Sequence, residues 1–260
     1  MKPNLDLGSV NRQFKLSNKN FFTGSGQKKQ IYIHHTVTPP DPLDFYRYLQ
    51  GVSHPFGTFS VIAGKPYNPV SHTHFRDGEI FQLFPSKYWS IHLGIHLNGN
   101  HIPEMYKTKN RCRELEKNSI GISLCNWGWL EWKNGCFKPQ GDSLKPVISN
   151  DEVIQYTTGY RGHQYYQKYS LAQIESLRQL LVFLCEEYQI PKTYNPDMWE
   201  INEAALSGKP GIYSHSSVRT DKDDCHPQPE LVQMLMDLET MKTFDRNPSF
   251  IFKQDHWKNG

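Results

Sequence analysis

The feature that most constrains the fold is a short apolar run that ends in two adjacent histidines, residues 31–37 (IYIHHTV). β-Branched and aromatic residues favour a strand, and the prolines that follow end it. Because neighbouring side chains of a strand point to opposite faces, we expect Ile31, Ile33 and His35 on one face and His34 on the other. A histidine at the end of a buried strand is held still by the scaffold, so it is either a candidate metal ligand or a buried hydrogen-bonding residue.

The composition restricts the class of protein. With 260 residues, 37% of them hydrophobic and 21% charged, the chain is long and apolar enough for one large globular domain. A net charge of +3 is too small to indicate a nucleic-acid partner, although it suits a mildly anionic polymer. We expect no signal peptide and no membrane span, because no stretch has the required apolar run. Five irregularly spaced cysteines without a CxxC pair indicate a reducing compartment and no disulfide framework.

Helices and strands alternate along the chain, which indicates an α/β or α+β fold. Capping signals predict three helices: one opened by Asp41 and Pro42, one opened by the capping box Ser170–Gln173, and one opened by Pro229. The second helix carries an apolar stripe of Leu171, Ile174, Leu177, Leu181, Leu184 and Tyr188 and ends before Pro191. Further strands are predicted at 57–63, 119–126 and 211–215, with a hairpin of 70–75 and 79–84 around Asp77-Gly78. Residues 101–117 are predicted to be exposed, 193–210 to form a loop, and 127–158 to form an insertion.

A second polar stretch follows the predicted strand 211–215. It runs from His215 to Pro227 and contains Lys222, Asp224 and Cys225. A catalytic zinc ion takes three protein ligands of nitrogen, oxygen or sulfur type and keeps one position open for water. His34 and His215 with Asp224 or Cys225 would supply such a set, whereas the alternative for this stretch is a solvated charged loop.

Five motifs in one order resemble the zinc-dependent N-acetylmuramoyl-L-alanine amidases, which share their fold with peptidoglycan recognition proteins. The motifs are residues 33–36 (IHHT), 77–82 (DGEIFQ), 88–94 (YWSIHLG), 118–122 (NSIGI), and His215 with 221–227 (DKDDCHP). The resemblance covers about residues 30–240. It implies a single domain with a central mixed β-sheet flanked by helices. The implied activity is cleavage of the amide between N-acetylmuramic acid and L-alanine, in polymeric peptidoglycan or in soluble muropeptides.

The resemblance also implies roles for individual residues. His34, His215 and Asp224 correspond to the zinc ligands, with Cys225 as the alternative to Asp224. Lys222 and His92 are implied to be catalytic, and His74, Trp89, Asn118 and Ser123 are implied to contact the substrate. The chain departs from the family pattern at the general base. Ser123 stands where many members have glutamate, and a serine cannot serve as that base. Activation of water would then depend on the zinc ion, which lowers the pKa of bound water to about 7.

The resemblance also leads to expectations about the domain organisation and the biological role of the protein. Residues 1–29 form an N-terminal arm, 30–242 the amidase domain and 243–260 a tail. We expect a monomer made in the cytoplasm that acts on peptidoglycan or muropeptides, as a wall-recycling enzyme, a phage endolysin or an effector exported without a Sec signal. The alternative is a non-catalytic peptidoglycan-binding protein of the same fold. An unrelated zinc peptidase is disfavoured because the chain has no HExxH motif.

Overall fold

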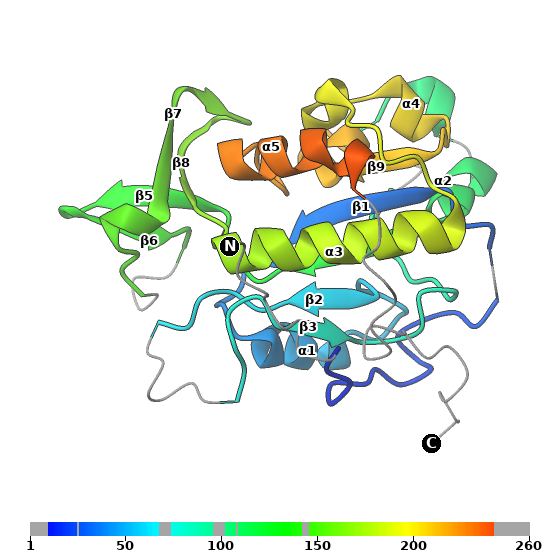
Figure 1. The fold of residues 1–260 in the computed structure, drawn as a ribbon, viewed down its shortest axis with the longest axis horizontal. Helices are drawn as coiled ribbons and strands as arrows, with labels where there is room; N and C mark the ends of the chain where they lie inside the picture. The colour runs from blue at the N-terminus through cyan, green and yellow to red at the C-terminus, as the bar shows by residue number, and fades with distance from the viewer. Residues whose placement is uncertain are drawn as a thin grey trace.

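A five-stranded mixed sheet forms the centre of the protein, and a second, four-stranded antiparallel sheet lies beside it (Figure 1). The computed structural model describes residues 10–24, 26–67, 74–95, 102–107, 109–141 and 146–241. The central sheet has the order β3-β2-β4-β1-β9. Its strands are β1 (Gln30–His35), β2 (Ser60–Ile62), β3 (Ile80–Gln82), β4 (Ser119–Leu124) and β9 (Gly211–Ser214).

Most neighbouring strands of the central sheet run parallel. β1 pairs in parallel with β4 and β9, β2 pairs in parallel with β4, and only β3 runs antiparallel to its neighbour β2. Every residue of these five strands is buried, as expected for a sheet covered on both faces. The predicted fold class, α/β with a central mixed sheet flanked by helices, is therefore confirmed.

The helices cover both faces of this sheet. Ile31 and Ile33 point into the larger core, which includes residues of α3 (Leu171–Tyr188) and α5 (Pro229–Asp237). Tyr32 belongs to a second apolar cluster, with residues of α2 (Lys109–Lys117) and α4 (Glu203–Leu206). The side-chain alternation predicted for β1 is thus confirmed. His34 lies on the face of Tyr32, and His35 lies on the opposite face, where it contacts Tyr169.

The predicted caps are present. In α1 (Pro42–Gly51) the Asp41 carboxylate accepts a hydrogen bond from the Leu43 N–H at 2.8 Å. In α3 the side chains of Ser170 and Gln173 accept from each other's backbone N–H groups at 3.0 and 3.1 Å. The predicted stripe of α3 is wrong at its first position, because Leu171 is 71% exposed. The short 3₁₀ helices are Glu104–Tyr106, Asn150–Glu152, Pro196–Trp199, His215–Ser217 and Leu238–Thr240.

Three other predictions need correction. β3 pairs with β2, and residues 70–73 of the predicted partner strand lie outside the described residues. The stretch 101–117 contains α2 and is not uniformly exposed, because Glu116 is buried. The predicted loop 193–210 contains a 3₁₀ turn and α4, whose N-cap Asn202 accepts from the Ala205 N–H. Glu116 shows why charge alone misleads, because its buried carboxylate is satisfied by backbone N–H groups of another segment.

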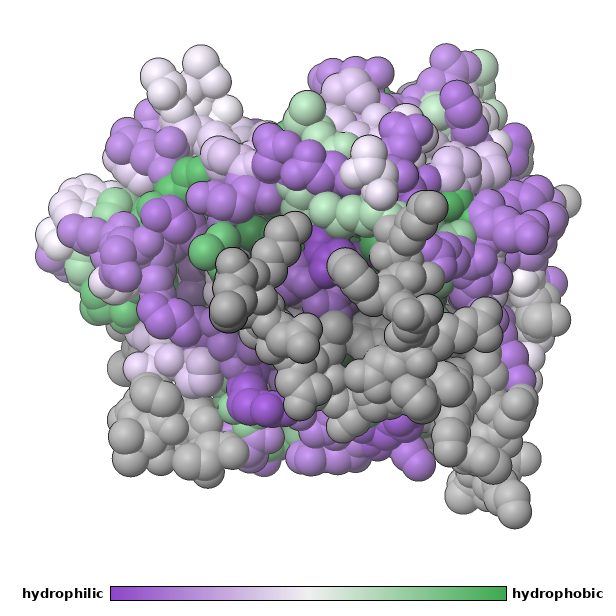
Figure 2. Space-filling view, in the orientation of Figure 1, coloured by the Kyte–Doolittle hydropathy of each residue, from purple (hydrophilic) through white to green (hydrophobic). Residues whose placement is uncertain are grey.

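The second sheet contains β5 (Trp129–Lys133), β6 (Cys136–Pro139), β7 (Val153–Tyr160) and β8 (His163–Gln167), in the order β6-β5-β8-β7. It therefore extends beyond residue 158, the predicted end of the insertion. A small core of Trp127, Leu130 and Ile148 supports it. Figure 2 shows that the described surface on the viewed face of the protein is mostly hydrophilic, with small apolar patches. Among the described helices, none combines the length and apolar character of a membrane span.

Candidate metal centre

Two histidines meet at the carboxyl ends of two neighbouring strands of the central sheet. His34 lies near the end of β1, and His215 directly follows β9. Since β1 and β9 are parallel neighbours with Ile33 opposite Ser214, the register brings the next residue of each strand side by side. The Nδ1 atoms of the two imidazoles lie 3.2 Å apart.

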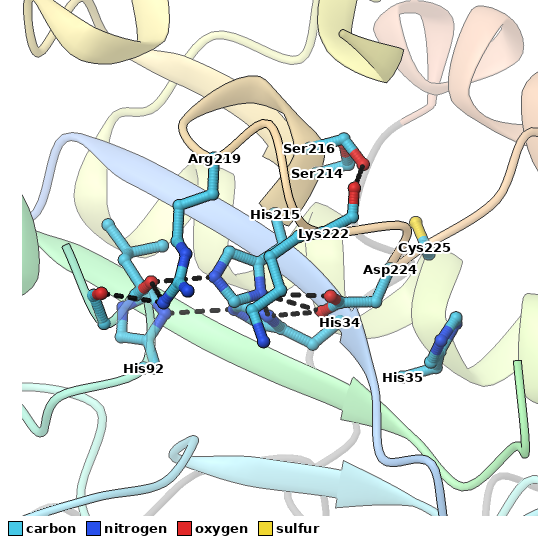
Figure 3. Close-up of polar contacts among 12 residues, drawn as sticks. His34, His35, His92, Ser214, His215, Ser216, Arg219, Lys222, Asp224 and Cys225 are labelled. Carbon is cyan, nitrogen blue, oxygen red and sulfur yellow. Dashed lines mark hydrogen bonds and ion pairs between the residues drawn. The ribbon is translucent and has the colours of Figure 1, made fainter. Parts of the chain in front are cut away.

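Asp224 completes the group (Figure 3). The polypeptide folds back after His215, and the His215 N–H donates to the Asp224 carbonyl at 2.9 Å. The Asp224 carboxylate then lies 2.9 Å from Nδ1 of His34 and 3.0 Å from Nδ1 of His215. All three residues are buried, and they are the one group in the described part of the chain whose donor atoms could hold a metal ion. The structure thus brings together His34, His215 and Asp224, as the sequence predicted.

Cys225, the alternative ligand, does not join this group. In Figure 3 its side chain points away from the two histidines. It is fully buried, and burial raises the pKa of the Cys225 thiol above its ordinary value. Because a thiol must lose its proton to bind zinc, both the geometry and the electrostatics favour Asp224.

The surroundings set the charges of the group. Burial lowers the pKa of His34 to about 4, although the hydrogen bond that its protonated ring donates to Asp224 opposes this effect. Burial by itself would raise the pKa of the Asp224 carboxyl, but the charges of protonated His215 and His34 and the hydrogen bonds that these protonated rings donate outweigh it and hold that pKa well below its ordinary value. At neutral pH the group therefore consists of a carboxylate and a neutral His34 imidazole.

The tautomer of His215 provides a test of whether a metal ion fits. Its Nε2 atom lies 2.8 Å from the carbonyl oxygen of Leu93, which can only accept, so Nε2 carries the proton. In the neutral ring Nδ1 then has a lone pair, and this lone pair faces the Asp224 carboxylate. Two electron-rich atoms at 3.0 Å repel each other unless a proton or a metal ion lies between them. Two imidazole nitrogens and a carboxylate are the donor types of catalytic zinc sites, so the residues fit this ion.

Lys222 is directed toward the same group. Figure 3 shows its side chain extending back from the loop toward His34 and Asp224. Its positive charge is among the causes that lower the pKa of His34. Its carbonyl oxygen accepts hydrogen bonds from Arg161 Nε and Ser216 Oγ, both at 2.9 Å, which fix the backbone at this position.

The second sheet supports the loop that carries Lys222 and Asp224. Arg161, in the turn between β7 and β8, donates to the carbonyl oxygens of Lys222 at 2.9 Å, Arg219 at 3.0 Å and Ser216 at 3.2 Å. The hydroxyl of Tyr160 donates to Ser216 Oγ at 3.0 Å. A charged donor with three carbonyl acceptors holds the loop more firmly than neutral hydrogen bonds would. The second sheet, in the part that lies beyond the predicted insertion 127–158, therefore contributes to the site, which the sequence did not indicate.

His92 lies behind His34 and not at an open side of the group. Its Nδ1 is 3.0 Å from His34 Nε2, and its Nε2 is 2.8 Å from Ser119 Oγ, so both ring nitrogens are engaged. The buried carboxylate of Glu116 fixes the backbone there, because it accepts from the N–H groups of His92, Leu93 and Gly94 at 2.8–3.1 Å. Sequence reasoning missed Glu116, because its partners are backbone groups of another segment, and assigned no role to Ser119 within the motif 118–122.

Of the four predicted substrate contacts, only Ser123 lies beside the metal group. His74 is hydrogen-bonded to Asp41 at 2.7 Å, beside the start of α1. Asn118 precedes β4, at the opposite end from the residue that pairs with His34. Ser123 is buried and lies 3.0 Å from Thr58 Oγ1. Trp89 stacks on Phe22 and lines a surface cavity of about 430 Å³. Ser123 is the residue that pairs with His34 across β4 and β1, but no side-chain hydrogen bond joins any of the four to His34, His215 or Asp224 within the described residues, so their substrate role stays a prediction.

Comparison with known proteins gives one family match. The family model described as N-acetylmuramoyl-L-alanine amidase matches residues 25–229. No curated protein matches the chain. Among solved structures, PlyL has 11% identity and a TM-score of 0.44, covering 87% of this chain and 96% of PlyL. AmpDH3 from Pseudomonas aeruginosa has 15% identity and a TM-score of 0.46, and this chain spans 65% of it. AmiD from E. coli, solved with an anhydro-N-acetylmuramic acid peptide as substrate, has 15% identity and a TM-score of 0.44, and this chain spans 63% of it.

Proposed function

The chain belongs to the N-acetylmuramoyl-L-alanine amidase family, and from this premise we propose that it is a zinc-dependent hydrolase of the bond between N-acetylmuramic acid and L-alanine. The substrate would be peptidoglycan or a muropeptide derived from it. The observation that carries the proposal is the convergence of His34, His215 and Asp224 at the carboxyl ends of two parallel strands. Zinc bound there would lower the pKa of a water molecule and polarise the scissile carbonyl.

The residues of the chain would divide the remaining work. His34, His215 and Asp224 would hold the ion and, being buried, keep bulk water from competing for it. Lys222 would place its ammonium group near the carbonyl oxygen that becomes negative, and would stabilise that charge. The same ammonium would protonate the leaving amine of L-alanine, because His92 is engaged on both nitrogens.

A second candidate function is peptidoglycan binding without hydrolysis. It is favoured by Ser123, which occupies the position where many members of the family have a glutamate base. Ser123 is buried and hydrogen-bonded to Thr58, so it neither accepts a proton at neutral pH nor faces the metal group with a charge. The complete ligand set favours the enzyme, since a protein that only binds peptidoglycan does not need a zinc site.

The two functions are separated by metal content and product analysis. We expect one zinc ion per chain, and chelator-sensitive release of new L-alanine amino termini from purified peptidoglycan or from a soluble muropeptide. The matched variant is His34→Ala, which should lose both zinc and hydrolysis. Retention on insoluble peptidoglycan without product release would establish the binding protein instead. Comparing the two substrates under equal conditions distinguishes a wall-lytic enzyme from a recycling enzyme.

A further inference from the structure

A chain of hydrogen bonds leads from the metal group to the end of helix α2. His34 Nε2 lies 3.0 Å from His92 Nδ1, His92 Nε2 lies 2.8 Å from Ser119 Oγ, and Ser119 Oγ lies 2.6 Å from the carbonyl oxygen of Leu115. His34, His92 and Ser119 are all at most 6% exposed. Water therefore has little access to this chain, and the direction of each hydrogen bond is decided by the protein itself.

The direction follows from the carbonyl end. The last carbonyl groups of a helix lack partners within the helix, and the Leu115 carbonyl can only accept. Ser119 has a single hydroxyl proton, and its other close backbone neighbour, the Glu116 oxygen at 3.3 Å, is also a carbonyl. The hydroxyl therefore donates to Leu115, and its oxygen accepts from His92. The proton of neutral His92 is thus on Nε2, and His92 Nδ1 accepts.

This direction fixes the tautomer of His34. Because His92 Nδ1 accepts, His34 Nε2 must carry the proton and donate it. Nδ1 of His34 then presents a lone pair toward Asp224 and His215. The carbonyl of Leu93 has the same effect on His215, as described above, so both imidazoles present Nδ1 lone pairs to one point.

We propose that His92 and Ser119 are positioning residues that hold His34 in the tautomer that binds zinc through Nδ1. This inference rests on the proposed zinc site and goes beyond it, because it assigns His92 a role behind the ligand and not at the substrate. The surrounding structure is built around this arrangement. A Cβ atom at Gly121 would lie 2.9 Å from His92 Nδ1, so only glycine leaves room for the ring there. Glu116 holds the His92 backbone in place.

The decisive variant is Ser119→Ala, compared with Ser60→Ala as a matched control. Both serines are buried in strands of the central sheet, but Ser60 Oγ has no hydrogen-bond partner within the described residues. Without the Ser119 oxygen, His92 is free to carry its proton on Nδ1, which would drive the His34 proton onto the atom that binds zinc. Loss of such an outer partner lowers metal affinity by about 10–100-fold. Ser119→Thr restores the hydroxyl and should restore the affinity.

Two measurements are needed. Zinc affinity is measured by competition with a chromophoric chelator, and histidine tautomers are measured by ¹⁵N NMR of histidine-labelled wild-type protein, with and without zinc. We expect weaker zinc binding in Ser119→Ala only, and protons on Nε2 of His34 and of His92. Equal zinc affinity of Ser119→Ala and Ser60→Ala, or a proton on Nδ1 of His34, would overturn the proposal. Both readouts are independent of hydrolysis, so a protein with the proposed tautomers and zinc affinity but without amidase activity would refute the proposed function alone.

Discussion

Replacing Asp224 by asparagine distinguishes the contribution of Asp224 to metal binding from its contribution to the stability of the metal-free fold. In the metal-free protein with both imidazoles neutral, the Asp224 carboxylate faces two Nδ1 lone pairs. No other hydrogen-bond donor to this carboxylate is present in the described residues. Asparagine is nearly the same size, and its amide nitrogen carries two protons, one for His34 Nδ1 and one for His215 Nδ1. We therefore expect Asp224→Asn to stabilise the metal-free protein.

The size of this effect follows from two hydrogen bonds. Each is worth about 0.5–1.5 kcal/mol net, so the pair contributes about 2 kcal/mol. For a chain of this length, that corresponds to a rise in Tm of roughly 4–8 °C. Zinc should stabilise the wild type but not the variant. At a hundredfold excess over its Kd, zinc stabilises a protein that binds it by about 2.7 kcal/mol. It should not stabilise the asparagine variant, because a neutral amide is a poor third ligand.

The assay is thermal unfolding of both proteins after chelator treatment, with and without added zinc. Asp223→Asn is the matched control, because it removes the same charge one residue earlier and should keep the zinc-induced shift. The reasoning would be refuted if metal-free Asp224→Asn unfolded at a lower temperature than the metal-free wild type. It would equally be refuted if zinc raised the Tm of the variant as much as that of the wild type.

Three further predictions concern single side chains. Lys222→Ala should keep its zinc but lose about 10²–10³ in kcat, as expected when a charge that stabilises the transition state is removed; unchanged turnover would exclude that role. Arg161→Ala should lower kcat by releasing the loop of Lys222, whereas Arg178→Ala, on α3, should not, and equal rates of the two variants would exclude the role of Arg161. Burial lowers the pKa of Lys28 from 10.5 to about 7, so the folded protein binds fewer protons there than the unfolded chain. The wild type should therefore gain stability relative to Lys28→Met as the pH rises from 7 to 10.5, measured by urea unfolding, and a constant difference would contradict this.

The sequence predicted those parts of the site that depend on local rules. Alternation along β1 placed His34 and His35 on opposite faces, and parallel pairing of β1 with β9 explains why residues 181 positions apart, His34 and His215, meet. The capping signals at Asp41 and Ser170 predicted where helices begin. The alternation and the caps depend on the spacing of a few residues, so a single sequence is sufficient to predict them, whereas the pairing of β1 with β9 comes from the tertiary structure.

The remaining parts depend on contacts that have no local signature. Glu116 lies in a charged stretch typical of an exposed helix, yet it is buried because three N–H groups of the His92 loop converge on it. Nothing in the local sequence distinguishes Ser119 from other serines at the start of a strand. Its proposed role comes from its hydrogen bonds to the carbonyl of Leu115 and to His92. Arg161 lies in a distant turn. Such roles are created by tertiary structure, so spacing along the chain does not reveal them.

The hydrogen bonds from Arg161 to the loop of Lys222 and Asp224 have a thermodynamic consequence for the second sheet. If the order of this loop favours zinc, then zinc must favour the order of the β7–β8 turn by the same free energy, because coupling between two sites is reciprocal. Hydrogen exchange at amides of the turn should therefore slow when zinc is added, although no atom of the turn is a proposed ligand. Anything that binds to the second sheet and immobilises this turn would, in the same way, tighten the hold on the metal.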